Sequence, residues 1–128
     1  IEAPSVSYDA EDFPVPSMLA SCDSEGTTIY LRRGASFNMD LCLAVAHELR
    51  HAWQIRSDKS FWLSSYKPRE KGSSLEEYNL QPAELDANAF SCVVLNTLFG
   101  VNPLFQGLPE SVRDEIYKRA KQIVKNNQ

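Results

Sequence analysis

The chain of 128 residues has little of what marks several large classes of protein. It has no apolar run long enough to span a bilayer, so we expect no membrane partner. Its three cysteines are an odd number without a C-x-x-C pair, which argues against a disulfide framework. We therefore expect reduced thiols and a cytoplasmic location. Cys42 and Cys92 lie in apolar runs and are expected to be buried, whereas Cys22, near a turn, is expected to meet solvent.

Basic clusters are also scarce. The net charge is −4, and no run of basic residues is longer than the pair Arg32-Arg33, so nucleic acid is not an expected partner. The apolar fraction of 43% and the charged fraction of 23% are ordinary for a soluble globular protein. A chain of this length can bury one core of its own. These numbers predict one domain and specify no oligomeric state.

Histidine is scarce too, because the chain has only two, and both lie in one H-E-x-x-H motif, His47-Glu48-Leu49-Arg50-His51. The preceding run has no Pro or Gly and favours a helix. Residues four apart on a helix lie on one face with Cβ atoms about 5–6 Å apart, so His47 and His51 can each offer a nitrogen to one zinc ion. Glu48, about a quarter turn away, can reach a water molecule at the metal without being a ligand.

The alternative interpretation of this motif is a surface helix with two solvated histidines. Four residues at helical spacing, Leu41, Val45, Leu49 and Ala52, form one apolar stripe. A helix with such a stripe packs on a core and turns its histidine face toward something else. The stripe therefore favours a metal site.

A catalytic zinc site usually has three protein ligands, and with no third histidine the third must be a carboxylate or a thiolate. The candidates lie on a helix predicted from Pro82 to Phe99, which Gly100 ends. Glu84 and Asp86 are two residues apart and point to nearly opposite sides of that helix, so only one can face the metal.

Glu84 is the better candidate, because it shares its face with small or polar residues (Ala87, Asn88 and Ser91) that let another helix approach closely. Asp86 shares its side with the apolar Phe90 and Val93. Asn88, one turn after Glu84, could accept a hydrogen bond from the second nitrogen of a ligand imidazole. The alternative is that Glu84 is an ordinary acid of the first turn, favoured there by the helix dipole.

The combination of H-E-x-x-H and a second helix with E-x-x-A-N resembles the gluzincin metallopeptidases. The finer pattern, an A-H-E-x-x-H-x-x-Q helix followed by Glu84-Leu85-Asp86-Ala87-Asn88-Ala89-Phe90, is similar to the ImmA/IrrE family over residues 20–98. The resemblance implies zinc on His47, His51 and Glu84, Glu48 as catalytic base, and cleavage of regulatory proteins such as phage-type repressors. The chain departs from the family in having Arg50 where a Gly is common, and in the absence of a predicted helix before the hairpin.

The predicted fold is α+β, a minimal zincin-like domain over residues 17–128 that follows an extended N-terminal arm, residues 1–16. Two β-prone runs, 17–22 and 27–32, are joined by a turn with Gly26 and predict an antiparallel hairpin. Three helices should follow: the metal helix from an N-cap at Asn38 to about Ser57, the ligand-bearing helix, and a C-terminal helix from Glu110 to about Lys125. The hairpin should pack on the metal helix.

Two further segments have alternative interpretations. Strand 27–32 comes just before the metal helix, where a peptide substrate could pair with a strand edge, or it belongs to a plain structural hairpin. The connection 58–79 is long and carries several aromatic residues, so it could be a lid or one wall of the cleft. Its aromatics could be packing anchors or substrate contacts, and either Tyr66 or Tyr78 could stabilise an oxyanion.

The sequence therefore predicts a zinc metallopeptidase that hydrolyses a peptide or protein substrate, with Glu48 moving the proton. One rival hypothesis is a catalytically inactive zincin-like module that binds or regulates a partner. The other is a structural protein with an accidental motif.

Overall fold

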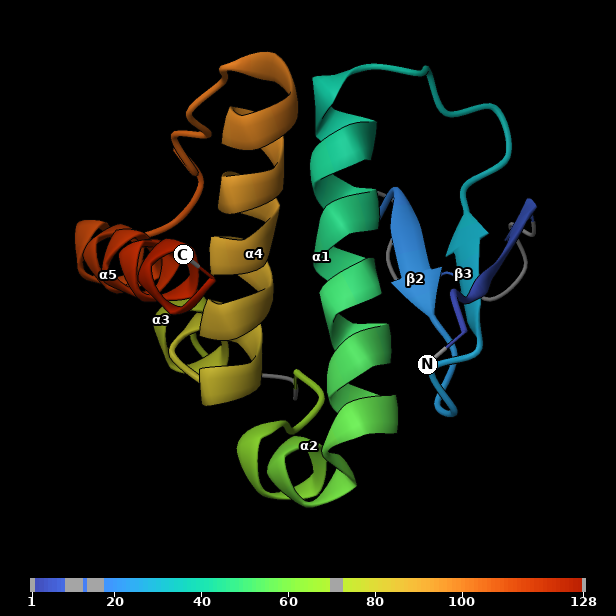
Figure 1. The fold of residues 1–128 in the computed structure, drawn as a ribbon, viewed down its shortest axis with the longest axis horizontal. Coiled ribbons are helices and arrows are strands. Elements are labelled where there is room, and N and C mark those ends of the chain that lie inside the picture. The colour runs from blue at the N-terminus through green and yellow to red at the C-terminus, as the bar shows by residue number, and fades with distance from the viewer. Residues whose placement is uncertain (1, 9–12, 14–17, 70–72, 128) are drawn as a thin grey trace.

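The structure is a computed structural model that describes residues 2–8, 13, 18–69 and 73–127. Two long antiparallel helices stand side by side at its centre, with a small sheet on the outer side of one and the C-terminal helix on the outer side of the other (Figure 1). The elements are β1 (Ser5–Tyr8), β2 (Ala20–Cys22), β3 (Thr28–Leu31), α1 (Met39–Ser57), α2 (Lys59–Ser65), α3 (Leu75–Asn79), α4 (Pro82–Phe99) and α5 (Glu110–Asn126). The α+β fold class predicted from the sequence is confirmed.

The sheet has the strand order β1-β3-β2. The antiparallel pair β2–β3 is the predicted hairpin, with Ser21 opposite Tyr30. Residues Ser5–Tyr8, in the segment expected to be an extended arm, form a third strand that pairs parallel with β3. The sheet is therefore mixed, and β3 is its central strand. The hypothesis that β3 offers a free edge to a substrate is wrong, because both of its edges are already paired.

Helix α1 begins and ends where the sequence predicts. The Asn38 side chain accepts a hydrogen bond of 3.0 Å from the Leu41 amide, which satisfies one of the free N–H groups of the first turn. Leu41 and Ala52 are buried against β2 and β3, and form a core cluster with Ala20, Ile29 and Leu31. Leu49, expected to share the buried stripe, is 38% exposed.

Helices α4 and α5 enclose a second apolar cluster. Pro82 occupies the first turn of α4, and Gly100 ends the helix in the left-handed conformation with φ of +66°. Helix α5 packs on Ala89 and Cys92 of α4 through one buried apolar stripe, which consists of Val112, Ile116, Ala120 and Ile123. The interface between α1 and α4 thus lies between two apolar clusters, and several buried polar residues line it: His51, Gln54, Glu84, Asp86, Asn88 and Ser91.

The connection between α1 and α4 contains two short helices that the sequence did not predict. Asp58 caps α2 and Ser74 caps α3, each by accepting a backbone N–H with its side chain. Helix α2 lies below the adjoining ends of α1 and α4 (Figure 1). Among the described helices, none combines the length and hydropathy that crossing a bilayer requires.

The cysteines differ in part from the expectation. Cys92 is buried as predicted, whereas Cys42 and Cys22 are both half-buried. Burial and the nearby Glu48 carboxyl raise the pKa of the Cys22 thiol to about 12, so the thiol is neutral at physiological pH. Cys22 is therefore less exposed than its place near a turn suggested.

The turn between β2 and β3 should be sensitive to a single added methyl group. Gly26 has a φ of +72°, and a Cβ there would lie 3.0 Å from both the Ala52 carbonyl oxygen and Arg56 Cγ. Gly34 has a similar φ of +83°, but a Cβ at that residue would meet nothing within 4 Å. Both Gly→Ala variants carry the strain of a positive φ, but only Gly26→Ala also pushes the turn away from α1.

We expect Gly26→Ala to lower the free energy of unfolding by about 1–3 kcal/mol more than Gly34→Ala does, the usual cost of overpacking. Urea denaturation of the two variants measures this difference. Equal losses would show that the turn does not depend on its close approach to α1.

Candidate metal centre

The two histidines of α1 and Glu84 of α4 meet at the interface between these helices. His47 Nε2 lies 3.2 Å from Glu84 Oε2, and His51 Nε2 lies 2.9 Å from Glu84 Oε1. The two imidazole rings are nearly perpendicular, with centroids 4.6 Å apart. Both Nε2 atoms are therefore directed at one carboxylate, each at a different oxygen.

These distances match the spacing of ligand atoms around zinc. In a tetrahedral site with bonds of about 2.0–2.1 Å, neighbouring ligand atoms are separated by about 3.3 Å. The ligand atoms of His47, Glu48 and His51 all lie within 4.8 Å of one another and form a cluster that could hold a metal ion. Glu84 adds an oxygen from the second helix at hydrogen-bonding distance from both imidazoles. The donor set of imidazole nitrogens and carboxylate oxygen fits zinc.

The second nitrogen of each imidazole contacts an amide oxygen. His47 Nδ1 lies 2.8 Å from Asn88 Oδ1, and His51 Nδ1 lies 2.8 Å from Gln54 Oε1. Amide oxygens only accept hydrogen bonds, so each Nδ1 is the donor and each Nε2 remains directed at the shared point. The contact of Asn88 was predicted. That of Gln54 was missed, although its position three residues after His51 places it on the same side of α1.

The connection between α1 and α4 supplies an aromatic wall, made of Trp62, Tyr66 and Tyr78, on one side of this site. The Tyr78 hydroxyl donates a hydrogen bond of 3.3 Å to Glu84 Oε1 and lies 3.1 Å from the Tyr66 hydroxyl. Trp62 stacks on Tyr66 and meets the His51 ring edge-on, with centroids 5.1 Å apart. Tyr78 is thus the tyrosine whose hydroxyl bonds to a candidate ligand, whereas the Tyr66 ring lies against that of His51 with centroids 5.9 Å apart. The sequence spacing did not provide this distinction.

Charges at the site stabilise one another. Burial alone would raise the pKa of Glu84, but hydrogen bonds from His47 and His51 hold it well below its usual range. Burial alone would lower the pKa of His47, but the hydrogen bond and charge of Glu84 raise it to about 9. In the metal-free protein Glu84 is therefore ionised, and His47 is protonated at neutral pH.

Glu48 has a different environment. Burial raises its pKa, an effect that the two histidines and a hydrogen bond with the Cys22 backbone only partly offset. A carboxyl group whose pKa is raised accepts a proton more readily than an ordinary glutamate. The Cys22 contact also fixes Glu48 against the end of β2.

Asp86 points away from the histidines, as its helical position predicts. Its carboxylate accepts hydrogen bonds from Arg50, Gln54 and Arg119. The two acids of α4 thus point to different sides of the helix, as their spacing of two residues predicts. Glu84 contacts the two histidines, and Asp86 contacts the two arginines. Arg50, the residue before the second histidine of the motif, is one partner of this second acid.

Comparison of the chain with models of known protein families, with characterised proteins and with solved structures found no match. The geometry of the described residues defines a small α+β domain with an H-E-x-x-H cluster that could hold a metal ion.

The raised pKa of His47 makes the stability of the metal-free protein depend on pH. A histidine whose pKa rises on folding from about 6.5 to about 9 contributes stability that is fully present below pH 6.5 and is lost as the pH rises through 9. In chelator, we expect the melting temperature to fall between about pH 6.5 and pH 9.5.

The control is Glu84→Gln, which removes the charge that raises the pKa of His47 and should flatten this part of the curve. The comparison between the two proteins is needed because Cys22, with its raised pKa, also destabilises the fold at high pH. Parallel curves for wild type and Glu84→Gln would contradict the assignment.

Proposed function

We propose that this chain is a zinc-dependent metallopeptidase. The observation that carries the proposal is the convergence of His47 Nε2, His51 Nε2 and the Glu84 carboxylate on one point. These three residues would hold the zinc ion, which leaves Glu48 of the same motif free for proton transfer. The orientation of each imidazole by an amide oxygen supports a built metal site rather than an accidental pair of histidines.

The chemistry follows from this division of roles. Zinc, when bound, would lower the pKa of a coordinated water to about 7 and polarise a substrate carbonyl. Glu48 would take the proton of the attacking water and deliver it to the leaving amine. Its raised pKa and its tie to the Cys22 backbone support a base that is held in place. The aromatic wall would exclude bulk water from the His51 side.

The sheet offers a substrate-binding edge at β2 instead of β3. The bonds from the Arg32 amide to the Leu19 carbonyl and from the Asp23 amide to the Thr28 carbonyl bracket the Ser21–Tyr30 pair. In an antiparallel ladder the backbone groups of alternate residues point away from the partner strand. Ala20 and Cys22 therefore direct theirs toward the outer edge of β2, which no other described strand pairs with, and the Cys22 backbone there meets Glu48.

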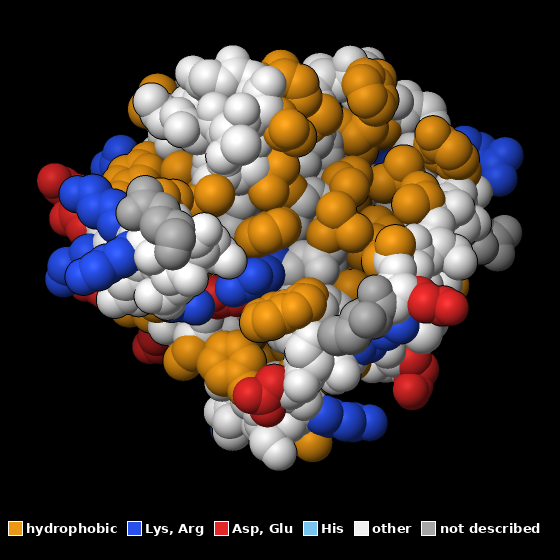
Figure 2. Space-filling model, viewed as in Figure 1, with side chains coloured by type: hydrophobic (Ala, Val, Ile, Leu, Met, Phe, Trp, Pro, Cys, Tyr) orange, Lys and Arg blue, Asp and Glu red, His pale blue; other side chains and the backbone are white. Residues whose placement is uncertain are grey.

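A groove beside this edge supports an extended substrate. A hollow of about 290 Å³ joins β2 to the candidate site and is lined by Met18, Leu19, Ala20, Asp40, Leu43, Ala44, His47, Glu48 and Asn88. It shares Asp40 and Leu43 with a second hollow of about 410 Å³ that continues to Leu95 and the segment 101–106. Apolar side chains gather over the upper parts of α1 and α4 (Figure 2). We infer a substrate segment that pairs with β2 and places apolar side chains in this groove.

The substrate we propose is a regulatory protein of the repressor type, which is what the ImmA/IrrE-like motifs imply. A protein substrate suits a groove that is open at the surface and longer than one side chain. The second candidate is a binding module that captures the same partner without cleaving it. The raised pKa of Glu48 favours the enzyme, because recognition alone does not need a proton acceptor at this place.

Glu48→Gln separates these candidates. Glutamine keeps the size of glutamate but cannot accept a proton at neutral pH, so zinc content and fold should be preserved while cleavage falls by about 10²–10⁴-fold. Cleavage is followed by mass spectrometry, first on a mixture of peptides and then on repressor-like proteins. Glu77→Gln, which changes an exposed acid of α3, should cleave at the wild-type rate.

The outcomes distinguish the two roles. If Glu48→Gln cleaves as fast as wild type, Glu48 is not the base. If zinc-loaded wild type binds a repressor-like protein tightly and leaves it intact, the chain is a binding module.

A further inference from the structure

A buried acid, Asp86, joins three helices beside the metal centre. Its side chain is 5% exposed and receives Arg50 of α1 through Nε at 2.7 Å and Nη2 at 3.2 Å. Arg119 of α5 approaches the same carboxylate through Nε at 2.9 Å and Nη2 at 2.8 Å. Gln54 Nε2 completes the set at 2.9 Å. The Asp86 carboxylate is thus the shared ion-pair partner of two arginines.

Gln54 connects Asp86 to His51, a candidate metal ligand, because its side-chain amide hydrogen-bonds to both residues. The residue is fully buried, and its Nε2 donates to two acceptors, the Ala83 carbonyl at 3.0 Å and Asp86 Oδ2 at 2.9 Å. Both N–H bonds of the amide are therefore used, and Oε1 is left facing His51 Nδ1 at 2.8 Å.

The reversed orientation of this amide is excluded by charge. It would place Gln54 Oε1 at hydrogen-bonding distance from the Asp86 carboxylate and from the Ala83 carbonyl oxygen, with no hydrogen between Oε1 and either oxygen. It would also turn an N–H₂ group toward His51 Nδ1, which would then need to be the unprotonated nitrogen. The Asp86 carboxylate, paired with two arginines, thus selects the amide orientation that keeps the proton on Nδ1 of His51.

The other histidine does not depend on this network. His47 Nδ1 lies 2.8 Å from Asn88 Oδ1, and no hydrogen bond between described residues joins Asn88 to Asp86. The two imidazoles are therefore oriented by different hydrogen bonds. His47 is oriented by Asn88 of α4, whereas His51 is connected to α5 through Gln54, Asp86 and Arg119.

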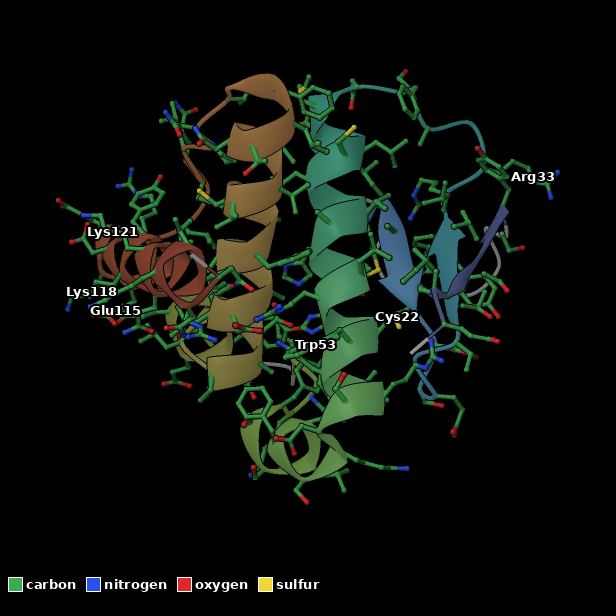
Figure 3. The ribbon with its side chains drawn as sticks, viewed as in Figure 1. Cys22, Arg33, Trp53, Glu115, Lys118 and Lys121 are labelled. Atoms are coloured by element: carbon green, nitrogen blue, oxygen red, sulfur yellow. The ribbon has the colours of Figure 1, made fainter. Side chains whose placement is uncertain are left out.

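We propose that Asp86, which pairs with Arg50 and Arg119, is a positioning residue that fixes the Gln54 amide and so presents His51 Nε2 to the metal. This inference rests on the metal centre of the proposed function. It assigns the C-terminal helix a role at the site beyond its apolar packing, because α5 carries Arg119. Glu115, Lys118 and Lys121 lie on the outer side of the same helix (Figure 3).

The test is Asp86→Asn, read by two measurements on the full chain. An asparagine can still accept from Arg119, but it cannot satisfy both arginines and Gln54, so the Gln54 amide loses its fixed orientation. Zinc affinity, measured by competition with a chelator, should fall by about 10–100-fold, as for other residues that orient a metal ligand. Nitrogen-15 NMR of the zinc-loaded protein should show the His51 Nδ1–H signal lost or exchanging faster, with the His47 Nδ1–H signal unchanged.

Arg119 provides a second variant, in case Asp86→Asn does not fold. Arg119→Met should weaken zinc binding and perturb the His51 signal alone, and Arg119→Lys should restore both in part, because a lysine can still donate to Asp86. Lys118→Met is the matched control. It removes the neighbouring cation of α5, whose side chain is 72% exposed and pairs with Glu115, and it should change neither measurement.

The outcomes separate this inference from the metal centre itself. If wild type binds no zinc, the metal centre is wrong and this inference falls with it. If wild type binds zinc but the variants weaken binding while the His51 signal stays intact, or alter both histidines equally, Asp86 supports only the fold and the inference is overturned. Unchanged zinc affinity in the variants overturns it as well.

Discussion

The carboxylate of Glu84 between two imidazoles is the interaction on which the site depends, because it joins α4 to α1 at the point where the metal ligands must meet. This interaction requires α1 and α4 to approach each other closely. The small side chains of Ala83 and Ala87, both fully buried on α4, allow that approach. Burying an acid and two histidines is costly unless each has a partner, and here every ring nitrogen faces an oxygen. The polar interface is thus satisfied before a metal arrives.

The two apolar clusters position this polar interface. One joins α1 to the sheet and the other joins α4 to α5, so each ligand-bearing helix is held from its outer side. The same arrangement places the edge of β2 beside Glu48 and the aromatic wall beside His51. Glu84 and Asp86, two residues apart on one helix, have different partners: Glu84 contacts the two histidines, and Asp86 pairs with Arg50 and Arg119.

Local signals in the sequence predicted much of this architecture. Asn38, Pro82 and Gly100 act through the nearest turns of the chain, so the bounds of α1 and α4 follow from them. The helical period assigned His47, His51 and Glu84 to facing sides, and the structure brings them together. Long-range features were missed. Strand β1 has four residues and forms only by pairing with β3, and α2 and α3 are too short to show a period. Gln54 and Arg119 gain their roles only from the packing of three helices around Asp86.

The central claim is that His47, His51 and Glu84 hold one zinc ion, and X-ray absorption spectroscopy of the zinc-loaded chain tests it most directly. We predict one zinc per chain, with nitrogen and oxygen neighbours at about 2.0–2.1 Å, two imidazole signatures and no sulfur. In Glu84→Gln the zinc should be bound more weakly, and with the two imidazoles retained. A sulfur neighbour at about 2.3 Å, a single imidazole, or no bound zinc would contradict the account.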